Sequence, residues 1–82
     1  MDSEHAWWRE IAFETYRSAW SEIQERWRGP HGRDVEYLVE ELKEALLDLK
    51  QATIADDEPL AVQYMDEVAT LLIELRLRGK DE

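Results

Sequence analysis

The sequence predicts an all-α fold, a single domain of three antiparallel helices spanning residues 1–82. Three segments carry apolar side chains at alternating steps of three and four residues, which is the spacing of one helical face. Two short breaks rich in glycine, proline and acidic residues separate these segments. The composition, 44% hydrophobic and 37% charged, is too apolar for a disordered acidic tail. We expect helices over about residues 4–28, 34–52 and 59–78.

The first helix is predicted from an apolar stripe that consists of Phe13, Tyr16, Trp20, Ile23 and Trp27. This face is widened by Trp8, Ala12 and Ala19. The helix is expected to end at Gly29 and Pro30, because proline cannot continue a helix and glycine relaxes the turn.

The second helix is expected to begin with Asp34 as its N-cap, because a side-chain oxygen there accepts a hydrogen bond from the first turn. Its predicted buried stripe consists of Val35, Leu38, Leu42, Ala45, Leu46 and Leu49. The acidic run from Asp56 to Glu58, followed by Pro59, is a typical opening of a third helix. The core face of that helix is predicted to consist of Ala61, Met65, Val68, Leu72 and Leu75.

The chain has more apolar surface than three short helices can cover. The third helix carries a second apolar line of Val62, Ala69, Ile73 and Leu77. Four tryptophans of about 200 Å² each represent on the order of 20 kcal/mol of burial at about 25 cal/mol per Å². We therefore expect a homo-oligomer, a helical-bundle dimer or tetramer.

Trp7 and Trp8 are adjacent, so both cannot face one core. One of them is predicted to cover a neighbouring subunit or a binding partner, and an extended edge of the core is the alternative. The line of Val62, Ala69, Ile73 and Leu77 is predicted to be an interface rather than a membrane-binding face, because the rest of its helix is not basic.

The net charge of −10 excludes several partners. Direct nucleic-acid binding is not expected, because neutralisation of phosphates by lysine and arginine supplies most of that affinity. A basic protein surface would be attracted. The chain has no cysteine and no apolar run of the roughly 18–20 residues that cross a bilayer, and its start lacks a signal-peptide layout. We expect a cytoplasmic protein that does not bind membranes.

Carboxylates are the candidate chemical groups, since no nucleophilic serine motif and no phosphate-binding glycine loop is present. Folding the last two helices into an antiparallel hairpin would place Glu44 opposite Glu67 and Glu41 opposite Thr70. Three carboxylates and a hydroxyl would then converge, and such oxygen ligands suit magnesium or manganese. The alternative is that these side chains are simply the solvated faces of a helical hairpin.

The segment Leu-Val-Glu-Glu-Leu-Lys-Glu at 38–44, with Asp-Glu-Val-Ala-Thr-Leu-Leu-Ile at 66–73, resembles the MazG-like all-α nucleoside triphosphate pyrophosphohydrolases. The resemblance implies magnesium-dependent cleavage of a nucleotide to its monophosphate and pyrophosphate. Glu41 and Glu44 match the first Glu-x-x-Glu pair of that family, and Glu67 matches the first residue of its Glu-x-x-Asp pair. Thr70 stands in place of the family's aspartate and contributes a neutral oxygen, so the resemblance also allows a degenerate relative that only binds nucleotide.

Arg28 and Arg33 belong to a basic corner around the first turn. The guanidinium geometry suits phosphate or carboxylate, so this corner is a candidate phosphate-binding site. The alternative is that its arginines simply favour the carbonyl end of the first helix.

Two functions follow from these patterns. The first is a small acidic protein–protein interaction module without catalysis of its own, an adaptor or inhibitor of the kind that phages and mobile elements encode. The second is the magnesium-dependent nucleotide pyrophosphohydrolase or its degenerate relative. No catalytic residue can be assigned for either.

Overall fold

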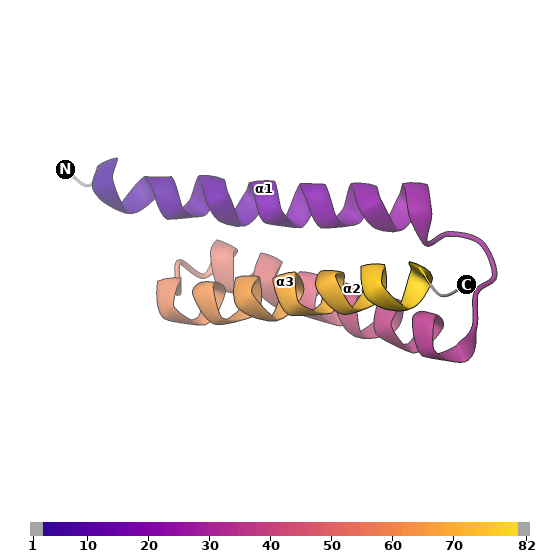
Figure 1. Ribbon diagram of the computed structural model, residues 1–82. Coiled ribbons are helices and arrows are strands. Elements are labelled where there is room, and N and C mark those ends of the chain that lie inside the picture. The colour runs from indigo at the N-terminus through magenta and orange to yellow at the C-terminus, as the bar shows by residue number, and fades with distance from the viewer. Residues whose placement is uncertain (1–2, 81–82) are drawn as a thin grey trace.

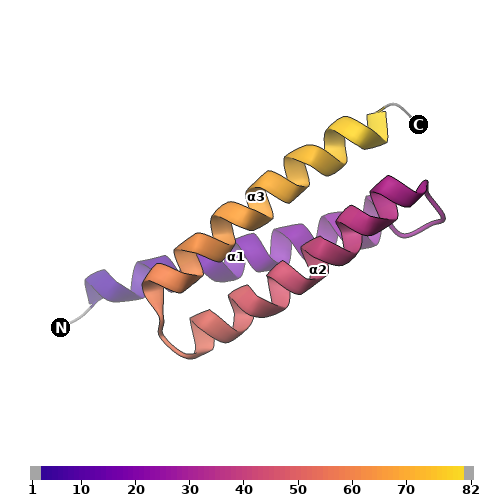
Figure 2. The ribbon, with the colours of Figure 1, turned by 90° about the horizontal axis from the view of Figure 1, so that it is seen from below.

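A computed structural model describes residues 3–80, with side chains from Trp7 onward, as three helices running up, down and up (Figures 1 and 2). The helices are α1 (Ser3–Arg26), α2 (Arg33–Ile54) and α3 (Glu58–Lys80), and each end lies within two residues of its predicted position. The all-α fold is therefore confirmed. The bundle is a rod of 49 × 17 × 16 Å, and none of the described helices is long and apolar enough to cross a membrane.

The core lies between α2 and α3, which pack more extensively with each other than either does with α1. Leu42, Leu46 and Leu49 of α2 and Val68 and Leu75 of α3 are completely buried. Complete burial of such a side chain contributes about 1.5–3 kcal/mol. The six residues of the predicted α2 stripe are all buried, and Val39, Ala52 and Thr53 extend it.

The first helix turns a slightly different face inward than its sequence predicted. Its buried residues are Trp8, Ala12, Ala19 and Ile23, and Trp27 directly after the helix is buried as well, whereas Phe13 is 47% exposed. Tyr16 and Trp20 are half-buried at the edge of this face. The predicted stripe was therefore wrong at Phe13, because the small residues Ala12 and Ala19 rather than the larger aromatic rings occupy the line closest to α2 and α3.

The turn between α2 and α3 is closed by backbone hydrogen bonds. The amide of Asp56 donates to Thr53 O at 3.1 Å, and the amide of Asp57 donates to Ala52 O at 3.0 Å, which is a Schellman motif. Asp56 has a φ of 62°, a left-handed conformation that aspartate tolerates better than most residues. Asp57 then caps α3, because its Oδ1 accepts a hydrogen bond from Leu60 N at 3.4 Å.

The start of α2 differs from the prediction. Its N-cap is Gly32, in an extended conformation, and the carbonyl of Gly32 accepts the amide of Glu36 at 3.0 Å. Asp34 is therefore already inside the first turn. Its Oδ2 instead accepts a hydrogen bond from Arg78 Nη1 at 3.2 Å, which links the start of α2 to the end of α3.

The end of α1 is fixed against the end of α3 by a cluster around Trp27. Arg76 of α3 donates two hydrogen bonds to Glu22, from Nη2 to Oε1 at 2.6 Å and from Nε to Oε2 at 3.0 Å. The indole Nε1 of Trp27 donates to the same carboxylate at 3.3 Å. The Trp27 ring lies over Gly79, where a Cβ atom would stand only 2.7 Å from Cζ3.

We expect the substitution Gly79→Ala to destabilise the fold. Overpacking against Trp27 costs about 1–3 kcal/mol, and the higher helix propensity of alanine recovers about 1 kcal/mol. The expected net loss, about 1 kcal/mol, is measurable by urea unfolding. Gly29→Ala is the matched control, because nothing lies within 4 Å of a Cβ there. Equal stability of the two variants would contradict the close packing of Trp27 on Gly79.

We also expect the contribution of Glu22 to stability to depend on pH. The hydrogen bonds from Arg76 hold the pKa of Glu22 below its usual value, although partial burial opposes this shift. A lowered pKa in the folded state means that the stabilisation is complete above the ordinary glutamate pKa of about 4.3 and is lost as the pH falls through the folded-state value. Glu22→Gln should therefore cost about 1–2 kcal/mol at pH 7 and clearly less at pH 3. The exposed Glu25, substituted in the same way, serves as the control, and a cost for Glu22→Gln that is independent of pH would refute the ion pair.

Candidate functional site

The residues predicted to bind a metal lie on the expected pair of helices but do not converge. Glu41 is half-buried, while Glu44, Glu67 and Thr70 are exposed. The hydroxyl of Thr70 donates to the carbonyl of Asp66 at 3.0 Å. Among the described residues, no group of three or more histidine, cysteine, aspartate or glutamate side chains could hold a metal ion. The arrangement therefore does not fit the oxygen cage that the family resemblance implies.

The antiparallel arrangement of α2 and α3 was correctly predicted, yet the predicted convergence is not present. The space where the two helices meet is filled by completely buried side chains, among them Leu42, Leu46 and Val68. Glu44 is exposed on α2 and Glu67 is exposed on α3.

The two arginines predicted to bind phosphate are both exposed. Arg28 lines a pocket of about 250 Å³ between the first turn and α2, and Arg33 does not line it. The charged residues of this pocket are Arg28 and Lys43 together with Glu36 and Glu40. Two carboxylates in the same small pocket oppose the binding of a phosphate.

The predicted interface residues divide into buried and exposed ones. Trp8 is only 4% exposed and packs in the core with Ala12, Leu49, Ala52 and Ala61, so its assignment to an interface was wrong. Trp7 next to it is 59% exposed. The line on α3 is also exposed, at 49% for Val62, 56% for Ile73 and 62% for Leu77, and Ala69 between them is exposed as well. The chain itself therefore leaves this line uncovered.

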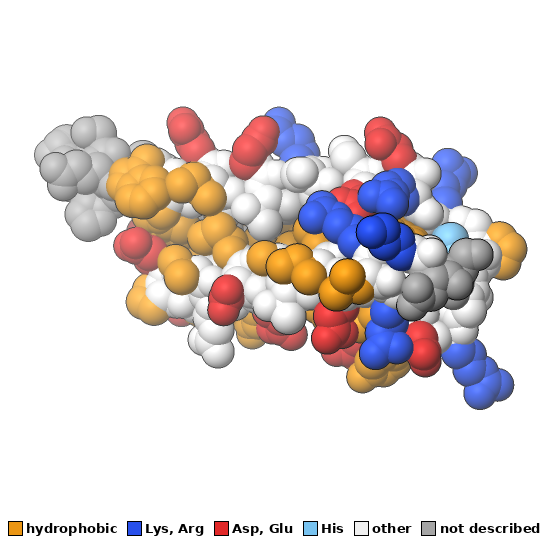
Figure 3. All heavy atoms as spheres, viewed as in Figure 1, with side chains coloured by type: hydrophobic (Ala, Val, Ile, Leu, Met, Phe, Trp, Pro, Cys, Tyr) orange, Lys and Arg blue, Asp and Glu red, His pale blue; other side chains and the backbone are white. Residues whose placement is uncertain are grey.

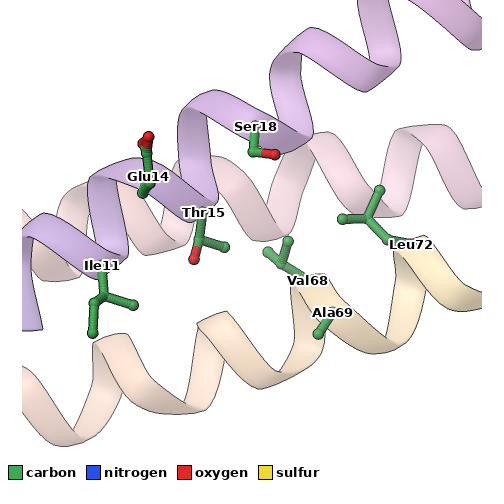
Figure 4. A pocket seen from close by; sticks show the side chains of 7 residues that line it. All are labelled: Ile11, Glu14, Thr15, Ser18, Val68, Ala69 and Leu72. Atoms are coloured by element: carbon green, nitrogen blue, oxygen red, sulfur yellow. The ribbon is translucent and has the colours of Figure 1, made fainter.

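A groove of about 370 Å³ runs between α1 and α3 beside this line (Figure 4). Its walls are Ile11, Glu14, Thr15 and Ser18 of α1 and Val68, Ala69 and Leu72 of α3. Ile11 and Thr15 point toward α3, whereas Glu14 points away from the groove. We call the groove together with the exposed Trp7, Val62 and Ile73 the α1–α3 face. It is mostly apolar, with small polar side chains in the middle.

A second candidate surface, the outer face of α2, was not recognised from the sequence. Four exposed carboxylates, Glu36, Glu40, Glu44 and Asp48, follow one another at steps of four residues along the helix. Residues at this spacing are neighbours on a helix surface. Three large apolar side chains are exposed on the same helix, Tyr37 at 65%, Leu47 at 51% and Ile54 at 68%. The signal was present in the sequence as a regular row of acids, which we call the acidic row.

The acidic row is poorly neutralised. Lys43 lies 3.7 Å from Glu40, and the amide of His31 donates to Glu36 at 3.4 Å. Glu44 and Asp48 form no ion pair with the described part of the chain. Like charges four residues apart destabilise a helix by about 0.2–0.5 kcal/mol per pair, so the three successive pairs cost on the order of 1 kcal/mol. The row therefore does not serve the stability of α2.

No protein-family model, no curated protein and no solved structure matches this chain. The resemblance to the MazG-like pyrophosphohydrolases accordingly stays a prediction.

The position of Glu44 predicts the outcome of a magnesium titration. We expect calorimetry at millimolar magnesium, with and without a non-hydrolysable nucleoside triphosphate, to show no saturable binding, because the carboxylates do not converge within one chain. The variant Glu44→Gln is the control. Saturable binding by the wild-type chain that is lost in this variant would establish the metal site and favour the pyrophosphohydrolase.

Proposed function

We propose that the chain is a small acidic protein–protein interaction module, an adaptor or an inhibitor, that has no catalysis of its own. The outer face of α2 is its binding surface, and its partner presents a basic surface with apolar side chains. The observation that carries the proposal is the acidic row, which lies beside the exposed Tyr37, Leu47 and Ile54 on one helix.

The two kinds of side chain would contribute in different ways. Apolar side chains at the centre of an interface supply most of the affinity, and aromatic rings such as that of Tyr37 are frequent among them. Carboxylates around them attract a basic partner, accelerate the encounter and reject acidic competitors. The net charge of −10 acts in the same direction.

The cost of the acidic row supports a binding role rather than a structural one. A basic partner would relieve the repulsion between Glu40, Glu44 and Asp48, so part of the electrostatic cost in the free protein becomes binding free energy. A row of evenly spaced negative charges also has the electrostatic character of a nucleic-acid backbone. An inhibitor that occupies the basic site of a nucleic-acid-binding protein would have this size and charge.

The proposal predicts that one substitution changes stability and binding in opposite directions. Glu44→Lys replaces two repulsive pairs, with Glu40 and Asp48, by attractive ones. It should stabilise the fold by about 1 kcal/mol and abolish capture of a partner by the immobilised protein. Captured partners are identified by mass spectrometry and then titrated as purified proteins at 50 and 300 mM salt. Electrostatic binding should be weaker at 300 mM than at 50 mM salt.

The matched control is Glu10→Lys, which makes the same charge change on an exposed position of α1. It should keep the partner, because the acidic row is unchanged. The proposal fails if both variants lose the partner equally, or if Glu44→Lys retains it with an unchanged dissociation constant.

A further inference from the structure

The α1–α3 face is an apolar surface that the described part of the chain leaves open. In Figure 3 the apolar side chains gather across this face, from the first half of α1 onto α3. Its exposed members include Trp7 and Ile11 on α1 and Val62 and Ile73 on α3, each between 46% and 59% exposed. Contiguous apolar surface of this extent, on so small a domain, is typical of a protein interface.

We propose that a second copy of the chain covers the α1–α3 face, with the two rods antiparallel and Ala69 of each chain close to the twofold axis. This proposal uses a surface other than the outer face of α2, so it stands or fails independently of the proposed function. Each chain would keep its acidic row open to a partner.

The size of the face suits a stable dimer. One whole side of a rod 49 Å long and 17 Å wide measures roughly 800 Å², so a second copy that lies along the full length of the chain can reach the area that each partner contributes to a standard interface. The groove of about 370 Å³ at its centre offers room for side chains of the second copy. Thr15, Ser18 and Ala69 are small, so two helices can approach closely there.

The position of Ala69 within α3 identifies it as the crossing point. Glu58 and Lys80, the two ends of α3, each lie eleven residues from Ala69. Eleven residues are close to three full helical turns, so all three residues share one side of the helix. When two copies of α3 cross antiparallel at Ala69, Lys80 of each copy comes level with Glu58 of the other.

The distribution of charge selects the antiparallel arrangement. Basic side chains gather where α1 and α3 end, as Figure 3 shows for the visible face. This group consists of Arg26, Arg28, Arg33, Arg76, Arg78 and Lys80. Within the chain, Arg26 and Arg76 pair with Glu22, and Arg78 pairs with Asp34. The opposite end of the rod carries Asp56, Asp57 and Glu58 at the turn between α2 and α3, and Asp56 pairs there with Arg9. A parallel dimer would place the two basic ends together, whereas an antiparallel dimer places each basic end beside an acidic one.

Disulfide trapping tests the geometry, because the natural chain contains no cysteine. The variant Ala69→Cys should form a covalent dimer under mild oxidation at micromolar concentration, since a residue near a twofold axis meets its own copy. Leu47→Cys, on the exposed side of α2, is the matched control and should remain largely monomeric on a non-reducing gel. Equal cross-linking of the two variants would overturn the proposal.

A second combination of cysteine variants distinguishes the parallel dimer from the antiparallel dimer. In a parallel dimer α1 would face α3 of the other copy, so a mixture of Thr15→Cys and Ala69→Cys chains would yield the mixed disulfide, with little Ala69 homodimer. In the antiparallel dimer the Ala69 homodimer dominates. Predominance of the mixed species would therefore overturn the antiparallel geometry.

Light scattering during size exclusion measures the association without any cross-link. The wild-type chain should have twice the mass of one chain, and Ile73→Glu should raise the dimer dissociation constant at least roughly 30-fold, because it places a charge in the apolar face. Leu47→Glu on α2 should leave the constant unchanged. Circular dichroism verifies that both variants are folded, and a wild-type chain that is monomeric at 100 µM would refute the dimer.

Charge reversal tests the predicted alignment of Lys80 in one copy of α3 with Glu58 in the other. Glu58→Lys and Lys80→Glu should each weaken dimerisation several-fold at low salt, and the double variant should recover the affinity of the wild type because both signs are exchanged. Additive losses in the double variant would contradict the alignment of Lys80 with Glu58.

Discussion

The placement of α1 against the other two helices is the constraint on which the groove depends, and it is set at both ends of α1, by the cluster around Trp27 and by the core packing of Trp8 with the Arg9–Asp56 ion pair. α2 and α3 form a closely packed hairpin, and α1 makes fewer contacts with either. The Glu22–Arg76 ion pair and the packing of Trp27 on Gly79 fix α1 at one level and one rotation against that hairpin. Away from this cluster the small residues Thr15, Ser18 and Ala69 leave the groove between the helices open.

Some apolar residues of the chain form its core, and others remain exposed, where we propose that they serve association. A domain of 82 residues buries a smaller fraction of its surface than a larger one, so each completely buried leucine of α2 matters for folding. Trp7, Ile11, Val62 and Ile73 nevertheless remain at the surface, where they contribute little to the stability of a single chain. The acidic row on α2 even opposes folding through repulsion between neighbouring carboxylates. We propose binding as the reason for both surfaces, with a second copy on one and a basic partner on the other.

Helical spacing predicted the buried face of some helices in this chain better than that of others. All six residues predicted for the α2 stripe are buried, because they recur along one helical face, although Tyr37, Leu47 and Ile54 place apolar side chains on the outer face as well. On α1, aromatic residues occur almost all the way round the helix, and the spacing could not identify Phe13 as exposed or choose between Trp7 and Trp8. For the carboxylates, the spacing predicted Glu44 opposite Glu67 in an antiparallel hairpin. It could not give the direction of either side chain, which depends on how each helix is rotated about its axis.

The sequence by itself determined the all-α class, the three helices and the breaks between them, because periodicity, proline, glycine and capping residues act within a few positions of the chain. It also determined the acidic character of the protein and the surplus of apolar side chains. Only the tertiary structure decided which tryptophan is core and that the three glutamates stay apart. The same holds for the groove between α1 and α3. These properties depend on contacts such as Glu22 with Arg76, which join residues 54 positions apart and set the rotation and level of whole helices.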